Sequence, residues 1–126
     1  MIQWPMSYEI EYYEKPNGRA PVREFILDLN KKNRKMAARL VQDIDTLQLA
    51  GPELGEPHMK YLKSGLYELR SKVGTDITRV FYFFFFGNKI ILTNGFVKKT
   101  SQTPVTELEK AFRYKKDYEE NHDQLR

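Results

Sequence analysis

The pattern of hydrophobic and polar positions divides the first half of the chain into one strand and two helices. Apolar and polar residues alternate over Tyr8–Tyr13, which predicts a half-buried strand. From Pro21 onward apolar residues recur at helical spacing, and proline is typical of the first turn of a helix. After a polar break at residues 30–33, a second helical pattern continues to Gly51, with Pro52 just beyond it. The two helices are therefore expected to form a helical hairpin.

In the second half the period changes from helical to alternating. Residues 52–65, which contain prolines and glycines, are predicted to be a loop. Three strands of an antiparallel meander are predicted to follow, over Leu66–Ser71, Ile77–Phe86 and Lys89–Lys98. Pro104 is expected to open a terminal helix. This order predicts an α+β fold in which one sheet carries the helices on one face and leaves the other face free.

Length and composition fit one domain over residues 1–126, with residues 117–126 forming a mobile acidic tail. The chain contains no repeat or linker. It also has no cysteine, which excludes disulfides and thiolate metal sites and agrees with a reducing cytosol. The first residues lack the regions of a signal peptide, and no apolar run approaches the length of a membrane helix. A cytoplasmic protein without a membrane partner is expected.

The net charge of +4 understates how basic the body of the chain is. Four of the seventeen acidic residues fall in the last ten positions, against Arg126 alone. Between Lys60 and Lys99 there are eight basic residues and only Glu68 and Asp76. Such a local excess is typical of a phosphate-binding surface, although an ordinary solvated face would give the same count.

The catalytic repertoire is narrow. Only His58, in a loop next to a proline, and His122, in the polar tail, are histidines, and neither has clustered partners for nucleophilic or metal chemistry. The glycines form no phosphate-cradling motif. These exclusions leave a reaction that arginine and lysine carry out without a metal or cofactor. RNA suits it because its 2′-hydroxyl is the nucleophile, arginine can grip phosphate oxygens, and lysine can transfer protons.

Four residues are the candidates for this chemistry. Arg70 alternates with apolar neighbours in its strand, and Arg79 interrupts an otherwise apolar strand, where it must be solvated or paired. An antiparallel pairing of these strands would bring both guanidiniums to one phosphate; the alternative for Arg79 is a salt bridge to Glu68 or Asp76. Lys98 and Lys99 follow at the end of the last strand, where a solvated charge pair is the alternative. Further RNA contacts are assigned to Lys60, Lys63, Lys72, Phe96 and Thr100.

At these positions the sequence resembles the RelE/ParE superfamily of toxins, and most closely its HigB-like, phage-derived branch. The resemblance covers about residues 7–118. It is carried by three segments: LYELR at 66–70, RVFY at 79–82 and NGFVKKTSQTP at 94–104. The last is the most specific, because a glycine, an aromatic residue, paired lysines and a Thr-Pro helix start recur together in that branch.

The resemblance implies a RelE-like fold and a toxin of a type II toxin–antitoxin system that cleaves messenger RNA on the ribosome. It implies that Arg70 and Arg79 hold the scissile phosphate and that Lys98 or Lys99 is the basic residue at the end of the final strand. The implied partners are mRNA on the ribosome and a helix-turn-helix antitoxin, with operator DNA reached only through the antitoxin. The sequence departs from RelE at Glu68, where RelE has lysine. One alternative function is that of a ParE-like toxin, which inhibits DNA gyrase by binding and has no enzymatic activity. Another is a degenerate protein of the same fold that only binds its antitoxin and DNA.

Overall fold

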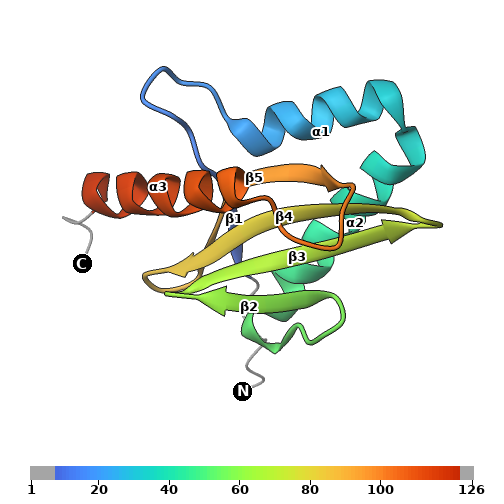
Figure 1. Ribbon diagram of the computed structural model, residues 1–126. Coiled ribbons are helices and arrows are strands. Elements are labelled where there is room, and N and C mark those ends of the chain that lie inside the picture. Colours follow the sequence, from blue (N-terminus) through green and yellow to red (C-terminus); the bar gives the residue numbers. More distant parts are fainter. Residues whose placement is uncertain (1–7, 123–126) are drawn as a thin grey trace.

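The computed structural model describes residues 8–122 as one sheet with helices on both faces (Figure 1). The elements in chain order are β1 (Glu9–Tyr12), α1 (Pro21–Lys32), α2 (Arg34–Ala50), the short 3₁₀ helix η1 (Gly51–Glu53), β2 (Met59–Lys63), β3 (Leu66–Val73), β4 (Asp76–Phe85), β5 (Lys89–Lys98) and α3 (Val105–Asn121). The predicted α+β fold, with an N-terminal strand, a helical hairpin, an antiparallel meander and a C-terminal helix, is confirmed.

The five strands are ordered β1-β5-β4-β3-β2. Strand β1 pairs with β5 in parallel, and the other neighbours are antiparallel. The β3–β4 register places Arg70 opposite Arg79. The β4–β5 register shifts between Val80 and Tyr82, which indicates a bulge in this pair. Strands β3 to β5 thus form the centre of the sheet, and the predicted antiparallel meander of these three strands is present.

The prediction of a loop over residues 52–65 is wrong for its second part, because Met59–Lys63 forms β2. This strand lies at the edge of the sheet and pairs antiparallel with β3, with Lys60 opposite Glu68. Tyr61 is half exposed and both lysines are exposed, so β2 has no buried face of the kind that gives a clear alternating signal. The meander therefore has four antiparallel strands.

The helices lie on both faces of the sheet, which corrects the expectation of one free face. Helices α1 and α2 cover one face and enclose the main core, to which β4 contributes Val80 and Tyr82. Helix α3 lies across part of the other face (Figure 1), where Phe83 and Phe85 pack against Tyr118. Hydrophobic periodicity identifies each amphipathic element but does not state which face of the sheet it covers.

Helix α3 also extends into the segment that was expected to be an acidic tail. It continues to Asn121, and Tyr118 is buried. The Tyr13 hydroxyl donates to Asp117 over 2.6 Å, and the Tyr118 hydroxyl donates to Glu11. These bonds fasten the C-terminal half of α3 to β1 and the residue after it, while residues 123–126 lie outside the described part of the chain. Among residues 8–122 no helix has the length and apolar character needed to span a bilayer.

Candidate functional site

The strand registers bring the predicted arginines together on one face of the sheet. Arg70 on β3 lies opposite Arg79 on β4, and Arg79 lies opposite Phe96 on β5. Two residues back along β4, Ile77 lies opposite Lys98. Because side chains two apart in a strand share a face, Arg79, Phe96 and Lys98 are on the face that α3 partly covers. We call Arg70, Arg79, Lys98 and Lys60 of β2 the cationic cluster.

A buried carboxylate lies at the centre of this cluster. Glu68 is only 1% exposed, and its Oε1 lies 2.7 Å from Nε of Arg79 and 3.6 Å from Nε of Arg70. Neither Nε–H points at the carboxylate well enough to make a hydrogen bond, so the three groups interact as charges. The ion pair of Arg79 with Glu68, one of the alternatives for Arg79, is therefore present. Arg70 and Arg79 also lie on the same face of neighbouring strands, as expected. Asp76 instead accepts a hydrogen bond from Asn33.

Burial and charge act together on the cations of the cluster. Burial lowers the pKa of the Arg79 guanidinium; Glu68 opposes this change and Arg70 adds to it. The pKa of Lys98 is also lowered, first by desolvation and then by the charge of Arg79, with Glu68 opposing. Arg70 and Lys60 lower it further, which places the other three cations within electrostatic reach of Lys98. A lysine with a lowered pKa is better suited to proton transfer than an ordinary surface lysine.

Aromatic residues border the cluster. Phe96 is partly buried and packs on Phe81, with ring centroids 5.7 Å apart. It lies between the cluster and the core, where part of its ring remains open. By contrast, Phe83 and Phe85 are core residues.

The other predicted RNA contacts lie around the cluster at different positions. Lys72 is exposed on β3, opposite Ile77, in the same cross-strand row as Lys98. Lys63 lies over the ring of Phe112 of α3, 5.6 Å from its centroid, and is directed away from the arginines' row. Lys99 and Thr100 are exposed in the connection after β5, where the Thr100 hydroxyl donates to the Gln102 carbonyl. These residues surround the arginines but do not form one compact group with them.

The structure adds His58 to the site, a residue that the sequence supported only weakly. A cavity of about 340 Å³ is lined by His58 together with Arg70 and Arg79. The reason is backbone pairing: the Arg70 N–H donates to the His58 carbonyl over 2.8 Å, next to the start of β2. Recognition of β2 as a strand partner of β3 would have placed His58 beside Arg70, but the sequence signal for β2 is weak.

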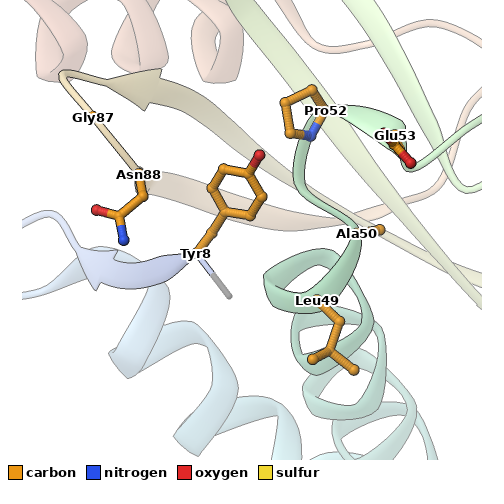
Figure 2. Close-up of a pocket in the computed structure, with 7 residues that line it drawn as sticks. All are labelled: Tyr8, Leu49, Ala50, Pro52, Glu53, Gly87 and Asn88. Carbon is orange, nitrogen blue, oxygen red and sulfur yellow. The ribbon is translucent and has the colours of Figure 1, made fainter. Parts of the chain in front are cut away.

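A larger cavity lies elsewhere. It measures about 950 Å³ and is lined by the end of α2, η1, Tyr8 and the β4–β5 turn (Figure 2). The β4–β5 turn follows the C-terminal end of β4, whereas Arg79 lies near the start of that strand. Gly51, where α2 ends, has a φ of +56°, and a Cβ there would lie 2.0 Å from the Tyr8 ring, so only glycine fits. The walls are mainly apolar and lack the cations on which phosphate chemistry depends.

Within residues 8–122, no three histidine, aspartate or glutamate side chains are grouped in a way that would hold a metal ion.

The comparison with curated proteins finds no match. The family comparison does: residues 24–116 match the family described as phage-derived protein Gp49-like (DUF891), which is more than half of the chain. The matched region runs from α1 into α3 and includes every residue of the cationic cluster. The chain therefore belongs to the Gp49-like family, a family of RelE/HigB-type toxins of toxin–antitoxin systems.

Proposed function

We propose that this toxin is a ribosome-dependent messenger-RNA endonuclease of a type II toxin–antitoxin system, in the HigB-like branch. The observation that carries the proposal is the placement of Arg70 and Arg79 opposite each other, with Phe96 and Lys98 on the same face of the sheet. Family membership supports ribonuclease toxin activity in general terms. It also implies an antitoxin partner, which we propose is a helix-turn-helix protein that carries the toxin to operator DNA.

The proposed reaction uses the RNA's own nucleophile. The 2′-hydroxyl oxygen forms a bond to the adjacent phosphorus, and the bond between phosphorus and the leaving 5′-oxygen breaks. A base takes the proton of the 2′-hydroxyl, and an acid gives a proton to the 5′-oxygen. Arg70 and Arg79 would stabilise the charge that grows on the phosphate oxygens, because planar guanidiniums bind them in pairs. Lys98, whose pKa is lowered, is the residue of the cluster best suited to a proton-transfer step.

A ribosome-bound substrate suits a site of this kind. The carboxylate at the centre of the cluster, Glu68, is buried between the two arginines and is not free to accept a proton from substrate. The cluster thus offers charge stabilisation, while the in-line geometry of the RNA must come largely from another source. Proximity and orientation can contribute several kcal/mol to such a reaction, and a message held in the ribosome would supply them.

The test is cleavage of a translated message by purified protein, mapped by primer extension. Arg79→Lys keeps a cation beside Glu68 but removes the planar fork, so we expect cleavage to fall by about 10²-fold or more. The matched control is Arg34→Lys at the exposed start of α2, which should cleave like the wild type. Unchanged cleavage by Arg79→Lys would remove Arg79 from the mechanism. Failure of the wild type to cleave a translated message would overturn the proposed activity.

A further inference from the structure

The cavity that His58 lines lies at the free edge of β3. Strand β2 pairs with β3 only as far as Leu69, so from Ser71 onward β3 has no partner strand on that side. The gap leaves a cavity of about 340 Å³ between α2 and the arginines of the cationic cluster. A smaller cavity of about 80 Å³ shares Arg39, Asp43 and His58 with it. Their combined size lies in the range of small-ligand pockets.

A buried hydroxyl without a protein partner lines this cavity. Ser71 is 1% exposed, and its hydroxyl has no hydrogen-bond partner among the described residues. Arg79, which is 6% exposed, also lines the cavity, and its Nε is paired with the Glu68 carboxylate at 2.7 Å. Buried polar groups are nearly always hydrogen-bonded in folded proteins. The Ser71 hydroxyl beside an open cavity is therefore expected to bond to water or to a polar ligand.

An ion pair on α2 forms the wall that faces away from the sheet. Nε of Arg39 lies 3.2 Å from each of the two oxygens of Asp43, one helical turn away. The Asp43 side chain is only 11% exposed, whereas that of Arg39 is 43% exposed. Because Arg39 makes this contact through Nε, its two terminal nitrogens keep their donors for a ligand. The carboxylate likewise keeps lone pairs that can accept further hydrogen bonds.

We propose that this cavity binds the nucleoside attached to the scissile phosphate, and that the Arg39–Asp43 pair selects guanine. The inference deepens the proposed nuclease function and rests on it. A phosphate held between Arg70 and Arg79 lies at the cavity wall, because both arginines line the cavity. The attached sugar and base then pass around the free edge of β3, beyond the end of β2, to reach α2 on the other face of the sheet.

Guanine is the base whose edges match this pair of side chains. Its N1–H and N2 amino group form two adjacent donors that a carboxylate can accept, and O6 and N7 form two adjacent acceptors for a guanidinium. Cytosine and adenine offer Asp43 only a single amino group. Uracil offers one N–H between two carbonyl oxygens, which a carboxylate repels. The pair therefore has donors and acceptors that only guanine satisfies together.

The test uses the purified full chain and four small probes: guanosine 3′-monophosphate, guanosine 5′-monophosphate, cytidine 3′-monophosphate and inorganic phosphate. Titration calorimetry should show that a guanosine monophosphate binds about tenfold more tightly than the cytidine compound, and more tightly than phosphate alone. Asp43→Asn should remove the preference for guanosine while leaving phosphate affinity unchanged. Asp45→Asn, at an exposed position on the same helix, is the matched control and should keep the preference.

The outcomes separate this inference from the proposed function. Guanosine binding no tighter than cytidine or phosphate, or a preference that survives Asp43→Asn, would overturn the nucleoside site whatever the result of the mRNA cleavage assay. If Asp43→Asn also lost phosphate binding, Arg39→Lys would decide, because it keeps the charge beside Asp43 and removes the planar fork. Loss of the preference in Arg39→Lys with intact phosphate binding would support the site, and retention would contradict it.

Discussion

At the scale of single residues, Glu68 explains how two arginines can lie side by side in a folded sheet. Two guanidiniums on adjacent strands repel each other, and the burial of Arg79 makes its charge still more costly. The carboxylate of Glu68 offsets part of this cost, since it lies within 4 Å of both groups. One negative charge does not neutralise two arginines, so the cluster keeps the positive excess that a phosphate would balance.

Replacing Glu68 by glutamine should therefore destabilise the fold in a way that phosphate reverses. The change keeps the side-chain shape but leaves both arginines uncompensated, and breaking a buried ion pair costs about 3–5 kcal/mol. Urea unfolding at low ionic strength should show this loss. Added phosphate should recover part of it, because an anion that binds only the folded state stabilises that state.

Glu109→Gln, at an exposed position on α3, is the control and should change neither the free energy of unfolding nor its response to phosphate. If Glu68→Gln unfolded at the same urea concentration as the wild type, the carboxylate would not be holding the cluster together. If phosphate stabilised Glu68→Gln no more than the Glu109→Gln control, the cluster would not be an anion site.

At the scale of elements, α3 depends on two tyrosine–carboxylate contacts for its position. Tyr13 bonds to Asp117 and Tyr118 bonds to Glu11, and both tyrosine rings belong to the core cluster beneath the helix. Burial, and then the hydrogen bond to the carboxylate, raises the pKa of both tyrosines. Each hydrogen bond requires the protonated phenol. Loss of the phenol proton at alkaline pH therefore removes the bonds that hold α3 against the sheet.

This linkage predicts a loss of stability in alkaline solution. Tyrosine in the unfolded chain loses its proton near a pH of about 10, whereas the raised pKa keeps Tyr118 protonated in the folded chain. The folded state then binds more protons, so the stabilisation is complete below that pH and declines as the pH rises above it. Tyr118→Phe should cost about 1 kcal/mol at neutral pH, from the lost hydrogen bond, and make the alkaline decline shallower.

Urea unfolding at a series of pH values between neutral and strongly alkaline measures both effects. Tyr61→Phe on β2 is the control, because the Tyr61 side chain is half exposed and accepts a hydrogen bond only from the Gly65 N–H. An alkaline decline in Tyr118→Phe as steep as that of the wild type would show that the Tyr118 phenol is not linked to stability.

The elements also show how far the sequence alone could lead. Strand patterns that lie close together in the sequence were sufficient to predict an antiparallel pair that brings Arg70 and Arg79 together, because both patterns are local features. The sequence left Glu68 and Asp76 as alternative ion-pair partners of Arg79, since the choice between them depends on the strand register. Strand β2 was missed because an exposed edge strand has no buried face, and His58 was undervalued as a result. The position of α3 on the second face of the sheet depends on contacts between residues far apart in the sequence, which a local pattern does not reveal.

At the scale of the whole molecule, the positive charge is concentrated where the sheet face is open. The cationic cluster lies near the start of β4, whereas the acidic residues Glu11 and Asp117 are hydrogen-bonded near the other end of the same face, under α3. The net charge of +4 therefore conceals a separation of charge, with the cations at one end of this face and acidic residues at the other. Such a distribution orients an RNA on the surface before any specific contact forms.

The salt dependence of RNA binding should reveal this concentration of charge. For single strands, each neutralised phosphate contributes about −0.7 to the slope of the logarithm of affinity against the logarithm of salt concentration. Lys60→Gln removes one exposed cation of the cluster, so the slope should become shallower by about 0.7 in anisotropy titrations with a short single-stranded RNA. Lys35→Gln removes an equal charge from α2, on the other side of the sheet, and should leave the slope unchanged. Equal changes from the two variants would mean that RNA responds to the total charge of the protein and not to the cluster, which would remove the electrostatic basis for placing the scissile phosphate between Arg70 and Arg79.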